Sequence, residues 1–136
     1  QNKVVRFIFG LNSRSHVGPE ELDKVNWLDT YHRGAQLKLS LVHDIYYNSS
    51  PGYLQSNFAK VSAVHRYNTR SSNFNFFVPN VKGLQSSTFY YSGINLWNSL
   101  PNDLKCIPIK SDFKPKLKQF LSTEMSRIES QVFYYY

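Results

Sequence analysis

The sequence predicts a mainly α-helical fold, in which an extended, aromatic-rich segment packs across a helical bundle. Two observations predict this fold. Apolar residues recur at spacings of three and four over residues 30–47 and again over residues 113–132. Between these stretches, residues 62–87 are rich in Ser, Asn and aromatic residues and lack helical periodicity. Of the 136 residues, 41% are hydrophobic, which is enough apolar material for a core.

Two short helices are predicted near the start of the sequence. Residues 1–10 place their apolar residues on one side, and Gly10 is a usual residue just after a helix. The β-branched run in this stretch would also suit a strand. Pro19 suits the first position of a second helix, where Glu20 and Glu21 complement the positive end of the helix dipole.

The longest early helix is predicted over residues 30–47, with Asp29 as its N-cap. Its expected apolar face is formed by Tyr31, Ala35, Leu39, Val42 and Tyr46, widened by Leu37, Leu41 and Ile45. The opposite face is expected to carry Arg33, Gln36, Ser40 and Asp44. A stripe this wide predicts burial on more than one side. A further short helix is predicted to begin at Pro51.

The stretch over residues 62–87 is expected to be extended, partly irregular chain that lies over the helices. Within it, "FNFFV" (residues 74–78) suits a strand that ends at Pro79.

The next helix is predicted to begin after Ser86, Ser87 or Thr88 and to bury Trp97. Tyr90, Ile94, Trp97 and Leu100 follow one another at helical spacings, which is a core pattern. Gly93 allows a close approach to a neighbouring helix, at a cost of roughly 1 kcal/mol relative to Ala. Pro101 ends the helix, because the residue before a proline disfavours the α conformation. We therefore assign structural roles to Trp97, Gly93 and Pro101.

The last helix is predicted from Ser111 or Asp112, with Pro115 tolerated in its first turn. Its apolar stripe is Phe113, Leu117, Phe120, Leu121, Met125, Ile128 and Val132. Lys114 and Lys118 border one edge of the stripe. Lysines at a helix start oppose the helix dipole, and a phosphate backbone would compensate for them. Alternatively, their aliphatic stems simply cover apolar surface.

The charge distribution favours a polyanionic partner. Sixteen Lys and Arg against nine Asp and Glu give a net charge of +7, and residues 45–102 contain no acidic residue. Such a field attracts nucleic acid. Cys106 is the single cysteine, so a disulfide within the chain is impossible. A single cysteine favours an intracellular location, cytoplasmic or nuclear. Cys106 itself is expected to be a buried small apolar residue.

No catalytic pattern is visible, and we expect a non-enzymatic protein that needs no cofactor and no metal. The sequence has no paired aspartates for two-metal chemistry, no phosphate-binding loop and no nucleophile motif. The four histidines lack metal-ligand spacing and are expected to be ordinary, partly exposed residues. A nuclease site assembled only in the folded chain stays open as an alternative. No apolar run approaches the roughly 18 residues of a membrane span, so no membrane partner is expected.

Residues 65–77, "HRYNTRSSNFNFF", are the stretch most typical of nucleic-acid binding. Arginines can fork onto phosphates and aromatic rings can stack on bases. The equally weighted alternative is a structural loop that Tyr67 and the arginines anchor on the core.

The order of several motifs resembles the region that follows the polymerase palm in non-LTR retrotransposon (LINE-like) reverse transcriptases. The motifs are "QNKVVRFIFG", the helix at 30–47, "PGYL", "HRYNTR", "VP" at 78–79, "FYYSGINLWNSLPNDLK" and "SDFKPKLKQFL". The resemblance spans residues 1 to about 122. It implies a thumb and a post-thumb connector without the palm, whose aspartates carry the RNA-directed DNA polymerase activity.

The resemblance implies a non-catalytic fragment that grips the backbone of an RNA or RNA–DNA duplex. It implies a thumb-like helical region over residues 1–50 and a connector-like region over residues 51–136, the two sharing one core. The predicted nucleic-acid contacts are Lys3, Arg6, Lys60, His65, Arg66, Arg70, Lys82, Lys114 and Lys118.

Other partners also follow from this resemblance. An upstream polymerase palm is an expected partner if the chain is a fragment. The alternative function is a retroelement-derived standalone module for protein interaction or structure, with an oligomer formed through the aromatic C-terminus at Tyr134–Tyr136.

Overall fold

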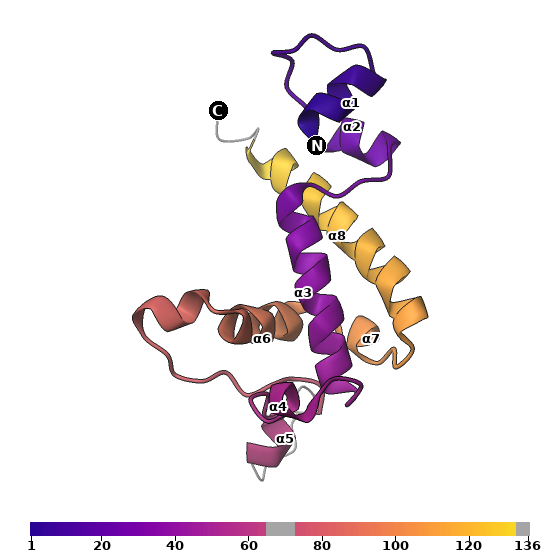
Figure 1. The fold of residues 1–136 in the computed structure, drawn as a ribbon. Helices are drawn as coiled ribbons and strands as arrows, with labels where there is room; N and C mark the ends of the chain where they lie inside the picture. The colour runs from indigo at the N-terminus through magenta and orange to yellow at the C-terminus, as the bar shows by residue number, and fades with distance from the viewer. Residues whose placement is uncertain (65–72, 133–136) are drawn as a thin grey trace. The chain divides into compact units, whose positions relative to one another are not determined.

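The described part of the chain is helical, as the sequence predicts. A computed structural model describes residues 1–64 and 73–132, and its helices are shown in Figure 1. These residues contain no strand. The elements are α1 (Asn2–Ile8), α2 (Pro19–Lys24), α3 (Thr30–Tyr46), α4 (Gly52–Gln55), α5 (Val61–Val64), the 3₁₀ helix η1 (Gly83–Ser87), α6 (Phe89–Ser99), α7 (Asn102–Lys105) and α8 (Lys110–Val132).

The chain divides into two compact units. The first unit comprises residues 1–36 and 116–136, and the second comprises residues 37–115. Helices α3 and α8 therefore each contribute residues to both units. The boundary that the sequence predicts, after residue 50, falls inside the second unit.

The helix ends of the first unit follow the capping signals of the sequence. Gly10 has a φ of 62° after α1, and the N–H of Leu11 donates to the Arg6 carbonyl at 2.8 Å, which closes a Schellman motif. Pro19 starts α2, as predicted. The Glu21 carboxylate accepts the Gly18 N–H at 2.9 Å, and this hydrogen bond lowers the pKa of Glu21.

The first unit has a small aliphatic core. Val5 of α1, Val17, Leu22 of α2 and Met125 of α8 form one buried cluster, against which Val25 packs. Each of these residues comes from a different short stretch of chain. Their burial therefore depends on the loop from Gly10 to Gly18 and on α8 reaching the two short helices.

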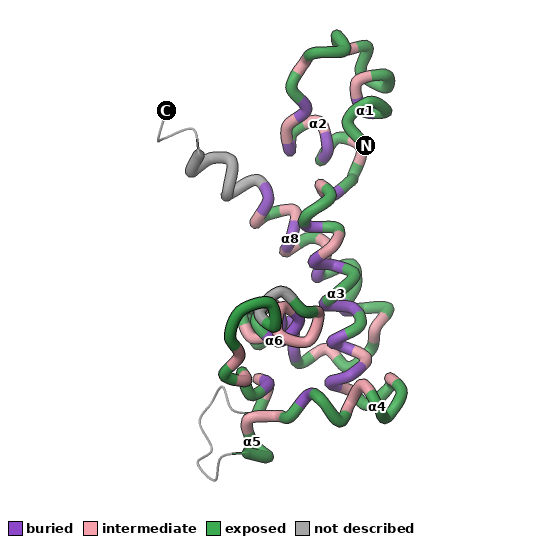
Figure 2. The backbone as a smooth tube through the Cα atoms, turned by 60° about the vertical axis from the view of Figure 1, so that its left-hand side comes forward, coloured by how far each residue is buried: buried purple, intermediate pink, exposed green. Residues whose placement is uncertain are grey.

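The second unit is organised around aromatic side chains. Trp97 is fully buried, and its ring stacks on Tyr46 with centroids 5.1 Å apart. Phe76 and Phe113 pack against it at 6.2 and 6.1 Å. Figure 2 shows buried positions along the part of α3 that lies beside α6. The prediction that α6 buries Trp97 is confirmed.

Helix α6 begins and ends where the sequence predicts. The Thr88 hydroxyl caps it by accepting the Tyr91 N–H, and Leu100 leaves the helix with a ψ of 148° before Pro101. Gly93 is buried in the contact with α3. A Cβ atom at Gly93 would lie 3.1 Å from a methyl group of Val42, so the glycine does allow the close approach predicted for it.

The buried face of α3 agrees with the predicted one at Ala35, Leu39, Val42, Ile45 and Tyr46, but Tyr31 is 73% exposed and polar residues widen the face. Gln36, Ser40 and His43 are buried, whereas Leu37 and Leu41 are 58% and 37% exposed. The predicted exposure of the histidines is also wrong for His32 and His43. These rings are buried because each has a partner: Asp29 for His32, and the Ile107 carbonyl and Phe113 ring for His43.

Two further expectations are corrected. Cys106 is exposed rather than buried, because α7 turns Leu104 and Lys105 inward and leaves the cysteine just beyond the helix end. The strand expected at "FNFFV" is reduced to one antiparallel bridge between Lys60 and Phe76. The Asn98 side chain of α6 bonds both outward backbone groups of Phe76, so no second strand can pair there.

Among the residues that the structure describes, no helix combines the length and apolar character that crossing a membrane requires.

Candidate nucleic-acid interface

The predicted contact residues are distributed over both units. Lys3, Arg6 and Lys118 belong to the first unit, and Lys60, Lys82 and Lys114 belong to the second. His65, Arg66 and Arg70 lie outside the described residues.

Three of these six cations are used inside the fold. The Arg6 Nε donates to the Ser15 carbonyl at 2.7 Å and so holds the loop after α1. The Lys118 Nζ donates to the Asn26 carbonyl at 2.7 Å. The Lys60 Nζ lies 4.1 Å from the centre of the Tyr46 ring, a cation–π contact. A phosphate group could bind these three cations only beside, or in place of, the contacts that they already make.

The other three cations are available to a ligand. Lys3 on α1, Lys82 before η1 and Lys114 on α8 are exposed. Asp29 forms an ion pair with His32, and Asp44 forms one with Lys110. None of the three exposed lysines takes part in either pair, so their charges face solvent unneutralised.

Backbone hydrogen bonds join two described segments, one before and one after residues 65–72 in sequence. The Val61 N–H donates to the Asn75 carbonyl at 3.0 Å, and the Phe77 N–H donates to the Ala59 carbonyl at 2.8 Å. These bonds flank the bridge between Lys60 and Phe76. The described residues 59–61 and 75–77, one segment before and one after Arg66 and Arg70 in sequence, are therefore hydrogen-bonded to each other.

Side chains of helices α6 and α3 hold residues 73–76 through hydrogen bonds. The Trp97 Nε1 donates to the Phe74 carbonyl at 2.9 Å, and the Tyr46 hydroxyl donates to the Asn73 carbonyl at 2.7 Å. Asn98 receives the Phe76 N–H at 2.9 Å and donates to the Phe76 carbonyl at 2.8 Å. The sequence predicts Trp97 only as a core residue. In the structure its indole N–H also positions the backbone at Phe74.

Lys105 is a buried cation that sequence reasoning missed. Only 1% of its surface is exposed, and its Nζ donates to the Asn75 side-chain oxygen at 2.8 Å and to the Asn98 carbonyl at 3.0 Å. Burial lowers the pKa of Lys105, because a charged ammonium loses its hydration there. The lysine ties α7 to α6 and to the anchored chain, so its role is structural.

His43 is buried beside the same aromatic cluster. Its Nε2 donates to the Ile107 carbonyl at 2.8 Å, while its Nδ1 has no hydrogen-bond partner within the described structure. Burial lowers the pKa of His43, an effect that the Ile107 carbonyl and Asp44 partly oppose. The ring is therefore a neutral core group that stacks on Phe113 at 4.3 Å.

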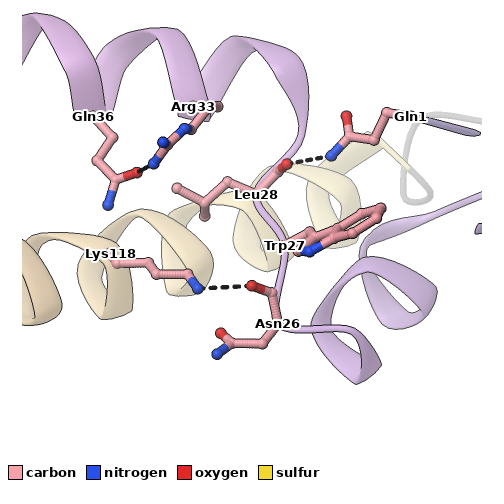
Figure 3. A pocket seen from close by; sticks show the side chains of 7 residues that line it. All are labelled: Gln1, Asn26, Trp27, Leu28, Arg33, Gln36 and Lys118. Atoms are coloured by element: carbon pink, nitrogen blue, oxygen red, sulfur yellow. Dashed lines mark hydrogen bonds between the residues drawn. The ribbon is translucent and has the colours of Figure 1, made fainter.

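A cavity of about 300 Å³ lies within the first unit (Figure 3). Trp27, Arg33 and Lys118 line it together with Gln1, Asn26, Leu28 and Gln36. Sequence reasoning included Lys118 among the contacts but omitted Trp27 and Arg33. The sequence does place Trp27 two residues before Asp29, the N-cap of the helix over residues 30–47, and so outside the apolar face of that helix.

No group of three or more His, Cys, Asp or Glu side chains that could hold a metal ion occurs in the described ranges.

Comparison of the chain with models of known protein families, with curated proteins and with solved structures gave no match.

Proposed function

We propose that this chain is a non-catalytic nucleic-acid-binding unit that grips the phosphate backbone of an RNA or RNA–DNA duplex. The observation that carries the proposal is the acid-free sequence from Ile45 to Asn102, which contains Arg66 and Arg70.

The resemblance to the thumb and connector of non-LTR retrotransposon reverse transcriptases is part of this proposal. In such an arrangement the palm would be a partner of this chain. The resemblance also accounts for a unit that binds through backbone phosphates and has little preference for sequence. An intracellular location, cytoplasmic or nuclear, belongs to the same proposal.

The test is the salt dependence of binding in the double variant Arg66→Ala, Arg70→Ala. Fluorescence anisotropy with a labelled RNA–DNA duplex, measured from low to moderate salt, gives the slope of log K against log salt. Each lost phosphate contact should reduce that slope by about 1, so the double variant should be shallower by about 2. Affinity should fall at every salt concentration.

The matched control is the double variant Arg14→Ala, Lys24→Ala. It removes the same charge from the first unit, outside the acid-free stretch and outside the predicted contact set. Its slope should change less than that of the first double variant. Equal slopes in the two double variants would show that only net charge matters and would contradict the proposal.

A second candidate function, protein interaction, is favoured by the exposed apolar face of α1. Val4, Phe7 and Ile8 are 49%, 86% and 51% exposed. Contiguous apolar surface of this kind is typical of association sites. Light scattering at low and high salt tests it, since apolar association persists at high salt. Self-association that Phe7→Ser abolishes would support this function, and a monomer at both salt concentrations would contradict it.

A further inference from the structure

The cavity of the first unit is lined by groups that recognise one kind of ligand. Figure 3 shows Trp27 on the segment between α2 and α3, Arg33 and Gln36 on α3, and Lys118 on α8. The side chains thus converge from three separate pieces of chain.

The segment that carries Trp27 is held at both ends. Asn26 has a φ of 56°, the Asn26 N–H donates to the Asp23 carbonyl at 2.9 Å, and the Trp27 N–H donates to the Leu22 carbonyl at 2.8 Å. This is a Schellman motif with Asn at the left-handed position. Two residues beyond Trp27, the Asp29 carboxylate accepts the His32 N–H at 2.7 Å and caps α3.

Side chains from outside the segment fix it further. Lys118 donates to the Asn26 carbonyl at 2.7 Å, and the Gln1 side chain donates to the Leu28 carbonyl at 2.5 Å. Leu28 itself is buried. The indole of Trp27 is therefore presented from a backbone that is already ordered, so a ligand that stacks on it has little ordering cost to overcome.

The lining combines an aromatic face with positive charge. Trp27 is 39% exposed, whereas Trp97, a tryptophan of the core, has no exposed surface. Arg33 and Lys118 supply two cationic groups, and Asn26 and Gln36 supply amides. Arg33 already donates to the Gln36 side chain and Lys118 to the Asn26 carbonyl, but each cation has further N–H groups that can donate to a ligand. Among the residues that the structure describes, no carboxylate lines the cavity. A ligand that satisfies this lining has a flat aromatic part and an anionic part.

We propose that this cavity binds one nucleotide unit, with the base stacked on Trp27 and the phosphate facing Arg33 and Lys118. The volume is at the lower end of the range for small-molecule sites, which suits a single unit. Bases inside a duplex are stacked on each other, whereas a single strand offers a free base face. The inference rests on the proposed function and assigns a single-stranded segment to the first unit.

Tryptophan fluorescence provides a direct measurement. Trp27 is exposed and Trp97 is buried, so a ligand that stacks in the cavity should quench only the Trp27 emission. The full chain is titrated with adenosine monophosphate, with a single-stranded oligoadenylate RNA of eight nucleotides, and with a duplex of the same length. The single strand should quench at lower concentration than the duplex. Quenching by the mononucleotide at equal concentration would identify a free nucleotide as the source of the same ligand chemistry.

Variants separate the cavity from general charge. Trp27→Ala should weaken single-strand affinity, measured by anisotropy, about 5- to 150-fold, as expected for loss of base stacking. Arg33→Gln should weaken it as well, without removing any buried side chain. Lys116→Gln is the matched control, because it removes an exposed charge of α8 that does not line the cavity. Circular dichroism checks that each variant is folded.

The outcomes distinguish this inference from the proposed function. Duplex binding with a steep salt slope but no quenching of Trp27 would overturn the nucleotide site and leave the proposed function standing. Quenching with equal strength in wild type and Arg33→Gln would also overturn it, as would a Lys116→Gln effect as large as that of Arg33→Gln. Mononucleotide quenching without binding of any duplex would support the site and contradict the proposed function.

Discussion

At the scale of single residues, the least expected feature is the burial of the Lys105 ammonium group. A buried ammonium normally pairs with a carboxylate, because its hydration is costly to lose. Here both hydrogen-bond acceptors, from Asn75 and Asn98, are neutral oxygens. The charge is therefore solvated by dipoles only, which is why burial lowers the pKa of this lysine.

The lowered pKa of Lys105 predicts how the free energy of unfolding depends on pH. Between the folded pKa of Lys105 and its ordinary value of 10.5, the unfolded chain binds more protons at this residue than the folded chain does. The free energy of unfolding therefore gains a contribution that rises with pH in that window. In Lys105→Met this contribution is absent. Urea unfolding from pH 7 to about pH 9.5 should show the stability of wild type rising relative to that of the variant.

Comparison of wild type with Lys105→Met also removes the contribution of tyrosine ionisation to the pH dependence of stability. Burial raises the pKa of Tyr46 and Tyr47, so their ionisation lowers stability at high pH. That effect is common to both proteins and cancels in the difference between them. A difference in unfolding free energy that stays constant over the pH range would contradict the prediction.

At the scale of elements, the contact of α6 with α3 depends on Gly93. Alanine favours a helix over glycine by about 1 kcal/mol, so Gly93→Ala would stabilise α6 if nothing opposed it. The new Cβ would lie 3.1 Å from a methyl group of Val42, which is fully buried, so that methyl group would have to shift against its neighbours. We expect Gly93→Ala to destabilise the wild type and to stabilise a Val42→Ala background by about 1 kcal/mol.

Urea unfolding of the four proteins in this double-mutant cycle gives the coupling between the two positions. The substitution Gly34→Ala in α3 serves as a comparison, because a Cβ at Gly34 would meet nothing within 4 Å. It should show the propensity gain alone. An equal effect of Gly93→Ala in both backgrounds would mean that the helices are not in close contact at this position.

Helix ends could be predicted from the sequence because their signals are local. Gly10, Pro19, Asp29 and Pro101 each act on the backbone of their own turn, and all four stand at the helix ends assigned to them. The apolar part of the buried face of α3 follows from periodicity, but its polar part could not be predicted in the same way. Burial of His43 depends on Ile107, which is 64 residues away in sequence, and no periodicity contains that partner.

The candidate site was only partly predictable for the same reason. The acid-free stretch is visible in the sequence, but its anchoring by Asn98 needs α6 to lie against residues 74–76. The cavity around Trp27 needs Lys118 to reach Asn26, 92 residues earlier. Spacing along the chain identified Lys118 as a basic residue and gave no indication of what it contacts.

At the scale of the whole molecule, the two units have cores of different character. Among the described residues of the first unit, the buried apolar side chains are aliphatic, as in the cluster of Val5, Val17, Leu22 and Met125. The second unit buries Trp97, Phe76 and Phe113. Each large aromatic side chain removes about 150–250 Å² from water, so its burial contributes more than that of an aliphatic residue.

This difference predicts that the first unit unfolds at lower urea concentration than the second. Each unit contains one tryptophan, Trp27 in the first and Trp97 in the second. The emission of Trp27→Phe reports the second unit alone, and its difference from wild type reports the first. We expect the midpoint of the Trp27 signal to lie below that of Trp97. Coincident midpoints would instead show one cooperative transition, in which α3 and α8, shared by both units, unfold together.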